Sequence, residues 1–191
     1  SLEYTIESNI ESLTLSKIKI LKQYNINRVS LGVQSFNPNT LKYLNRYHTK
    51  DQVIEVINNL KNNDITNINI DLIYATNNDI NELKEDLNTF LSLDIPHLSY
   101  YSLIIEDNTI LKINNTNYID EDIEYNMYKL INKTLTNNNY HQYEISNYSK
   151  DNYESIHNLN YWHNGNYYGF GLGSVSYLNN LRRSNTKNLT K

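Results

Sequence analysis

The chain has 191 residues, 39% of them hydrophobic and 20% charged, which is enough for one domain with a buried core. A net charge of −4 argues against nucleic acid or a membrane surface as a partner. Cysteine is absent, which excludes disulfides and thiolate-held metals for this chain. We find no apolar run long enough to span a bilayer and no signal peptide, so we expect a cytoplasmic protein without stable membrane insertion.

Strand-like and helix-like segments alternate along the chain. In chain order, the expected elements are a strand over Leu2–Glu7, a helix over Leu13–Tyr24, a strand over Ile26–Phe36, a short helix opened by Pro38 with Asn37 as N-cap, a helix over Asp51–Asn63, a strand over Asn67–Ala75, a helix over Ile80–Leu93, a strand over His97–Ile105, a helix over Asp120–Thr136 and a strand over Gln142–Tyr148. The apolar run of the second strand is typical of strands buried on both faces.

This alternation predicts an α/β fold built from parallel βαβ units. A doubly wound sheet and a (β/α) barrel both fit the order of elements. Polar residues inside the strands, namely Glu7, Gln34 and Asp71, favour the barrel, because side chains at strand ends converge on its open mouth.

Four polar residues are candidates for binding a charged small molecule. Glu7, Gln34 and Asp71 lie in strands, and Arg46 follows the short helix. A carboxylate can hold ribose hydroxyls, and Arg can bind a ligand carboxylate through two hydrogen bonds. The alternative is that Glu7 and Asp71 are exposed strand-end residues and that Arg46 lies on the surface of a helix.

The segment after Tyr148 is rich in aromatic residues and glycine. Its run "GFGLG" (Gly169–Gly173) differs from the dinucleotide-binding pattern in glycine spacing, so we expect glycine here to allow a sharp turn or a close backbone approach. His157 and His163 are possible ligands of a metal or a haem iron, although either is more commonly a structural or surface residue. The abundance of tyrosine, 18 residues in all, indicates compositional drift.

Several blocks of sequence follow one another in the order found in one family. They are "YTIESNIESL", "NRVSLGVQSFN", "LNRYHT", "NINIDLIYA", "HLSYYSLIIEDNT", "YHQYEISNYSK", "HNLNYW", "YYGFGLGSVSYL" and "RRSNTKNL". Together they resemble the radical-SAM family related to oxygen-independent coproporphyrinogen III oxidase, and within it the HemW-like haem chaperones. The resemblance covers nearly the whole chain.

The resemblance implies a partial, open (β/α) barrel of the radical-SAM type, incomplete at its N-terminus. Residues 1–148 would form this barrel from its third strand onward, and residues 149–191 a family-specific extension. S-adenosylmethionine (SAM) and a [4Fe–4S] cluster occupy the barrel mouth in this family. By resemblance, the SAM contacts here are Glu7, Gln34, Arg46, Asp71 and the backbone near Ile104.

The chain departs from the family pattern in three places. The cluster motif CxxxCxxC is absent, and we expect it to precede this segment, as we expect a small C-terminal domain to follow Lys191. The run "GLPGQT" after the Asp71 strand is replaced by "ATNNDI", which puts normal SAM binding in question. Val175 in "GSVS" stands where the family has histidine.

Three functions follow from the resemblance. The first is a haem chaperone that binds haem, SAM and a [4Fe–4S] cluster and passes haem to acceptor proteins, with His157 as the haem contact and Tyr161 and Trp162 beside it. The second is a coproporphyrinogen III oxidase, and the third a non-catalytic fragment. Because the cluster cysteines are missing, we expect no enzymatic activity from this chain alone.

Overall fold

A computed structural model describes residues 2–105, 107, 110–113 and 117–189. The chain divides into two compact units, Ser1–Glu154 and Ser155–Lys191. Each unit is described by itself below.

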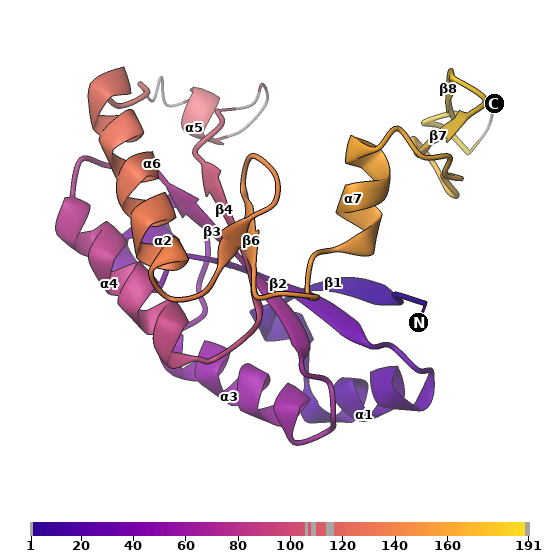
Figure 1. Ribbon diagram of the computed structural model, residues 1–191, viewed down its shortest axis with the longest axis horizontal. Coiled ribbons are helices and arrows are strands. Elements are labelled where there is room, and N and C mark those ends of the chain that lie inside the picture. The colour runs from indigo at the N-terminus through magenta and orange to yellow at the C-terminus, as the bar shows by residue number, and fades with distance from the viewer. Residues whose placement is uncertain (1, 106, 108–109, 114–116, 190–191) are drawn as a thin grey trace. The chain divides into compact units, whose positions relative to one another are not determined.

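The first unit is built on a six-stranded sheet with the order β1-β2-β3-β4-β6-β5 (Figure 1). Strands β1 to β4 pair in parallel, whereas β6 pairs antiparallel with both β4 and β5. The strands are β1 (Thr5–Asn9), β2 (Arg28–Gln34), β3 (Asn67–Tyr74), β4 (His97–Ser102), β5 (His141–Gln142) and β6 (Asn147–Ser149). Because β1 and β5 are both edges, the sheet is open, which confirms the prediction of an α/β partial barrel.

Helices connect the parallel strands, and their starts follow local signals in the sequence. Asn37 accepts hydrogen bonds from the backbone of Asn39 and Thr40, as predicted for an N-cap. Thr49 and Gln52 form a reciprocal capping box at the start of α3. The helices are α1 (Leu15–Gln23), α2 (Pro38–Tyr43), α3 (Lys50–Lys61), α4 (Ile80–Ser92), α5 (Ile110–Ile113) and α6 (Glu121–Thr136), with a 3₁₀ turn η1 (Ile10–Ser12) after β1.

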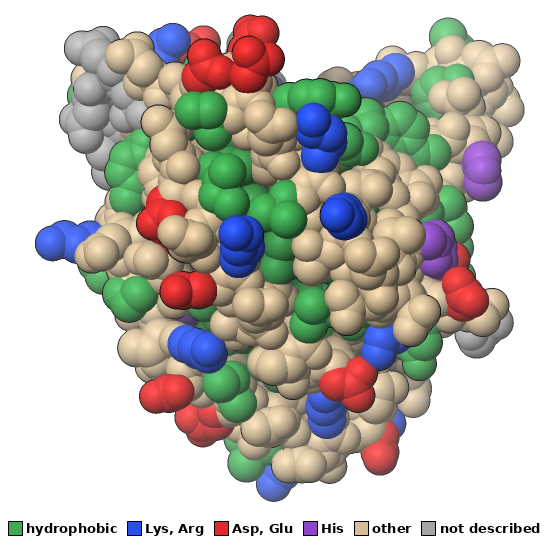
Figure 2. All heavy atoms as spheres, turned by 60° about the vertical axis from the view of Figure 1, so that its left-hand side comes forward, with side chains coloured by type: hydrophobic (Ala, Val, Ile, Leu, Met, Phe, Trp, Pro, Cys, Tyr) green, Lys and Arg blue, Asp and Glu red, His purple; other side chains and the backbone are tan. Residues whose placement is uncertain are grey.

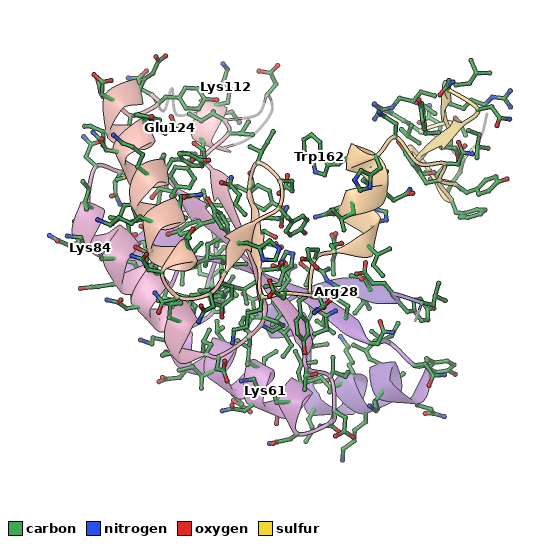
Figure 3. All side chains as sticks on the ribbon, in the orientation of Figure 1. Arg28, Lys61, Lys84, Lys112, Glu124 and Trp162 are labelled. Carbon is green, nitrogen blue, oxygen red and sulfur yellow. The ribbon has the colours of Figure 1, made fainter. Side chains whose placement is uncertain are left out.

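The hydrophobic core lies between one face of the sheet and the helices. Alternate residues of each central strand, such as Leu31, Ile70 and Leu98, are fully buried there. Each such side chain contributes about 1.5–3 kcal/mol by leaving water. The outer surfaces of the helices are polar: Lys84 extends away from the sheet (Figure 3), and Figure 2 shows both signs of charge interspersed. The opposite face of the sheet is left for polar residues.

The last expected strand of this unit, Gln142–Tyr148, is a hairpin instead. Residues between β5 and β6 turn back, and the Glu144 carboxylate accepts a hydrogen bond of 2.9 Å from the Ser146 backbone N–H. It also accepts one from the Asn147 side chain. This local turn reverses the chain, so β6 runs antiparallel to β4, and the prediction of a further parallel strand was wrong.

The second unit consists of one helix and a small hairpin. Helix α7 spans Ile156–Trp162, and strands β7 (Val175–Leu178) and β8 (Leu181–Ser184) pair antiparallel. Asn179 and Asn180 join them with φ angles of 51° and 62°, as a tight two-residue hairpin turn requires. No helix among the described residues of either unit is long and apolar enough to cross a membrane.

Two glycines of this unit, Gly169 and Gly171, allow backbone conformations and contacts that other residues would not. A side chain at Gly169 would come within 2.3 Å of the Val175 carbonyl oxygen, so only glycine permits that approach. Gly171 has a φ of 95°, which other residues rarely adopt. Both uses match the expectation of close approach and sharp turning.

Candidate cofactor and ligand sites

Polar residues of neighbouring strands meet in rows on the face of the sheet opposite the core. The strand register aligns them because residues directly opposite one another in paired strands point to the same face. One row consists of Glu7, Ser30, Asn69, His97 and Ser149, and the next, nearer the carboxyl ends of β1–β4, of Asn9, Gly32, Asp71, Ser99 and Asn147.

Asp71 lies at the centre of a hydrogen-bond network. Its carboxylate accepts a 2.8 Å bond from the Asn69 amide and a 3.3 Å bond from the Ser30 hydroxyl. Burial raises the pKa of Asp71, and the nearby negative charge of Glu7 raises it further, while hydrogen bonds from Asn69, Ser99 and Ser30 oppose the shift. The negative charges of Glu7 and Asp71, two of the predicted SAM contacts, are therefore close enough to repel each other.

His97 anchors the network from β4. Its Nδ1 lies 2.6 Å from Asn69 Oδ1, and its Nε2 lies 2.7 Å from the Tyr143 hydroxyl. Burial, with the charge of Arg28, holds the pKa of His97 well below its usual range, so the ring is neutral. Because Asn69 Oδ1 is an acceptor, His97 donates a hydrogen bond from Nδ1–H and accepts one from the Tyr143 hydroxyl at Nε2. The orientation of Asn69, and through it of Asp71, is thereby fixed.

Gln34 occupies a strained position at the end of β2. The pairing with β3 shifts register between Gly32 and Gln34, and Gln34 has a φ of 72°, in the left-handed region. Its amide nitrogen and the Asn9 side-chain oxygen lie over Gly32, 3.1 Å and 3.3 Å from where a Cβ would be. The bulge therefore directs the Gln34 amide over the face of the sheet that carries Asp71, beside a position without a side chain.

The chain beyond the bulge is held by a buried carboxylate of α4. Asp86 accepts a 2.8 Å hydrogen bond from the Ser35 hydroxyl and a 2.9 Å bond from the Phe36 backbone N–H. Burial raises the pKa of Asp86 to about 6, and the charges of Glu82 and Glu85 add to the shift. Asp86 thus fixes the two residues that follow Gln34.

Arg46 and Ile104 lie further from the network. Arg46 follows α2 in a loop and is half-buried. The backbone of Glu11 donates a hydrogen bond that lowers the pKa of the Glu11 carboxyl, and His48 and the positive charge of Arg46 lower it further. Arg46 therefore acts on Glu11, in η1, and not on the network around Asp71. Ile104 comes two residues after β4 and is 71% exposed. Within the described residues, Arg46 forms no hydrogen bond or ion pair with Glu7, Gln34 or Asp71.

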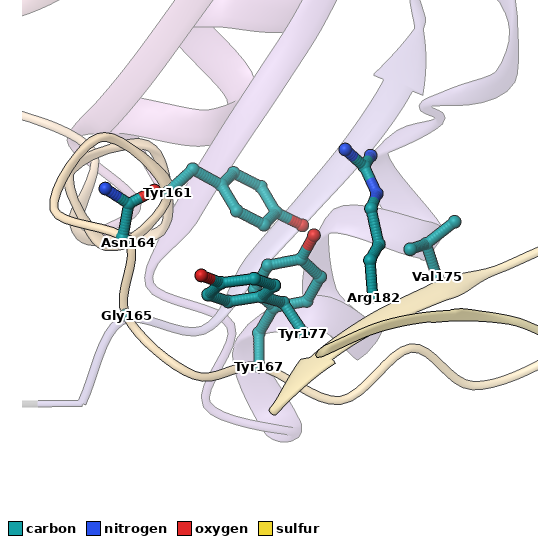
Figure 4. Close-up of a pocket in the computed structure, with 7 residues that line it drawn as sticks. All are labelled: Tyr161, Asn164, Gly165, Tyr167, Val175, Tyr177 and Arg182. Carbon is teal, nitrogen blue, oxygen red and sulfur yellow. The ribbon is translucent and has the colours of Figure 1, made fainter. Parts of the chain in front are cut away.

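The second unit carries a separate aromatic site (Figure 4). On α7, the rings of His157 and Tyr161 are 4.4 Å apart, and Tyr161 is 4.4 Å from Tyr167. Tyr161 also borders a pocket of about 530 Å³, and the residues that line the pocket are Tyr161, Asn164, Gly165, Tyr167, Val175, Tyr177 and Arg182. Trp162, on α7 in Figure 3, is 52% exposed and joins no aromatic pair among the described residues.

Sequence reasoning missed most of the residues of both sites. Asn69, His97 and Ser99 alternate with apolar residues in "NINID" and "HLS", and this period of two could have shown that they share a face with Asp71. Tyr167, Tyr177 and Arg182 come together only through the hairpin, which no local pattern fixes.

An iron–sulfur cluster does not fit the residues present. The chain has no cysteine. The described part of the chain contains no group of three or more His, Cys, Asp or Glu side chains placed to hold a metal ion.

The amino-acid sequence matches known proteins along nearly its whole length. The Radical SAM superfamily matches residues 2–89. The heme chaperone HemW of Lactococcus lactis subsp. lactis is 41% identical over 188 residues, which cover 96% of this chain and 50% of that protein. The heme chaperone HemW of Bacillus subtilis is 35% identical, with the same coverage of 96% and 50%. The chain thus spans about half the length of the curated relatives it matches.

The fold has a counterpart among solved structures. Coproporphyrinogen III oxidase (HemN) from Escherichia coli, a radical SAM enzyme, superposes on 98% of this chain with a TM-score of 0.83. The match covers 47% of that chain at 17% sequence identity, so it concerns the fold alone. Residues 2–89 therefore match the Radical SAM superfamily, and the chain is similar over nearly its whole length to curated haem chaperones named HemW, of which it spans about half.

Proposed function

We propose that the protein to which this chain belongs binds haem and delivers it to haem-acceptor proteins in the cytoplasm. The names of its relatives support this function. The observation that carries it within the chain is the aromatic site of the second unit, where His157 of α7 packs against Tyr161 at the border of a pocket. A neutral imidazole is a common axial ligand of haem iron, and aromatic rings suit a flat macrocycle.

We further propose that SAM lies over the polar face of the sheet, toward the carboxyl ends of its parallel strands. The chemistry of Glu7, Gln34 and Asp71 suits the hydroxyl and amino groups of SAM, and Arg46 suits its carboxylate. Bound SAM would supply a source of a 5′-deoxyadenosyl radical in a complete radical-SAM site. The chain's own residues would bind SAM and orient it. His97 and Asn69 hold the Asp71 carboxylate in place, and the bulge directs the Gln34 amide toward the proposed SAM site.

A haem titration followed by the Soret absorbance tests the haem site. We expect His157→Ala to weaken haem binding by about tenfold or more, equivalent to ~1.4 kcal/mol, and to change the spectrum of the bound haem. The matched control is His163→Ala, because His163 is also exposed and caps the C-terminal end of α7 but, unlike His157, forms no ring pair with Tyr161. Equal affinity and spectrum in wild type and His157→Ala would remove His157 from the haem site.

A further inference from the structure

We propose that the pocket beside Tyr161 is the part of the haem site that receives the edge of the tetrapyrrole ring, and that Arg182 pairs there with a propionate carboxylate. This inference rests on the proposed haem binding. It adds the residues that distinguish a tetrapyrrole bearing free carboxylates from one without them.

The pocket is built by one face of the small hairpin. Tyr167 bridges to Tyr177, with backbone hydrogen bonds of 2.9 Å in both directions, and Tyr177 stands opposite Arg182 in the β7–β8 register. Residues directly opposite one another in antiparallel strands share a face. The register therefore places Tyr167, Tyr177 and Arg182 side by side, as the pocket lining also indicates.

Aromatic rings give this face a flat wall. Tyr167 and Tyr177 stack with ring centroids 6.1 Å apart and an interplanar angle of 29°. Tyr161 of α7 meets Tyr167 edge-on at 87°, which closes one side of the pocket and links it to His157. A volume of about 530 Å³ falls within the usual range for small-molecule sites. Such a wall suits a large planar ligand.

Among the described residues that line the pocket, Arg182 is the only one with a positive side chain. In Figure 4 its guanidinium extends from β8 beside the rings of Tyr161 and Tyr177. It forms no ion pair with a carboxylate among the described residues. A guanidinium next to aromatic rings, without a carboxylate of its own, is complementary to a flat ligand with an acidic edge. Haem has that chemistry, since its macrocycle carries two propionates.

The neighbouring Arg183 provides a matched control. It stands opposite Ser176 in the same pair of strands, one residue from Arg182, so its side chain points to the other face of the hairpin. Both arginines are exposed, and a change to Gln removes the same charge from each without disturbing a core. Only the face on which the charge lies differs between the two variants.

The experiment compares the dissociation constants of haem and of haem dimethyl ester, whose propionates carry no charge, by Soret titration under identical conditions. We expect the wild-type chain to bind haem about five- to tenfold more tightly than the ester, as for one partly exposed charge-assisted pair. Arg182→Gln should bind haem and the ester equally, whereas Arg183→Gln should keep the wild-type preference.

The outcomes separate this inference from the proposed function. If the wild-type chain binds haem but Arg182→Gln keeps the preference for haem, the pairing is refuted and haem binding stands. An equal loss of preference in Arg183→Gln also refutes it, because bulk positive charge would then explain the effect. If the wild-type chain binds neither ligand, the proposed haem function fails together with the inference.

Discussion

The polar side chains on the sheet illustrate how single residues are placed by neighbours that carry no chemistry of their own. Asn69 donates to Asp71 and accepts from His97, so its amide must point one way. Glu7 and Asp71 were candidates because carboxylates at neighbouring strand ends suit a charged small molecule, and only the family resemblance assigned them to SAM. Their mutual influence became visible only with the register, which sets Glu7 one row from Asp71. Arg46 shares no local pattern with them, and its predicted contact with SAM stays a prediction.

Asp86 gives the stability of the fold a measurable pH dependence. Its pKa in the folded protein is about 6, above the ordinary value of 3.8, so the folded state holds this proton more tightly than the unfolded state. Asp86 therefore contributes stability that is fully present below about pH 4 and is lost as the pH rises through 6. We expect the unfolding free energy of wild type, relative to Asp86→Asn, to fall by roughly 2 kcal/mol between pH 4 and pH 7.

Chemical denaturation at a series of pH values measures this difference. Asp86→Asn is the comparison because an amide oxygen can still accept from Ser35 or Phe36, while the titrating proton is gone. The other titrating groups are common to both proteins and cancel in the difference. Curves of unfolding free energy that stay parallel across this range would show that Asp86 has an ordinary pKa.

At the scale of elements, the backbone of strand β2 is strained at its last residue, Gln34. Gln34, at φ 72°, adopts a conformation that costs a residue with a side chain about 1–2 kcal/mol. Glycine adopts it freely but loses more backbone entropy on folding, by about 0.5–1 kcal/mol. We therefore expect Gln34→Gly to raise the unfolding free energy by about 0.5–1 kcal/mol, as measured by urea denaturation.

Gln34→Ala is the control for this change. Alanine removes the amide but keeps a Cβ, so the strain remains and the unfolding free energy should not rise. A gain in stability with both variants would mean that the Gln34 side chain itself destabilises the strand. A gain with glycine alone would show that the backbone at Gln34 is strained, and no gain with glycine would show that it is not.

The hairpin of β5 and β6 marks the limit of pattern-based prediction for an element. "QYEISNY" has the alternation and residue types of a strand, and the parallel order of the preceding strands favoured a further one. The turn arises from the Glu144 carboxylate, which captures the backbone of Ser146 and the side chain of Asn147. Such side-chain capture of a turn depends on one residue and leaves no period in the sequence.

Across the whole molecule, the predictions that came true rest on repeated signals. Hydrophobic periodicity over many residues located α3, α4 and α6, and the alternation of strands and helices gave the open α/β sheet. The pocket of the second unit could not be predicted, because Tyr161, Tyr177 and Arg182 come from distant positions. The 18 tyrosines were attributed to compositional drift, and at least three of them, Tyr161, Tyr167 and Tyr177, gather at this pocket.

Because the whole chain lacks cysteine, we expect it to bind haem without carrying out radical chemistry. A [4Fe–4S] cluster is held by cysteine thiolates, and the chain has no cysteine, so anaerobic treatment with iron and sulfide should leave no cluster bound to it. Without the cluster no electron reaches SAM, and we expect no 5′-deoxyadenosine when the treated chain is incubated with SAM and a strong reductant and analysed by chromatography. Haem binding at His157 should persist in the same sample, because its proposed residues all lie in the second unit. Formation of 5′-deoxyadenosine above a control without protein would contradict this account, since it would require a cluster held by ligands other than thiolates.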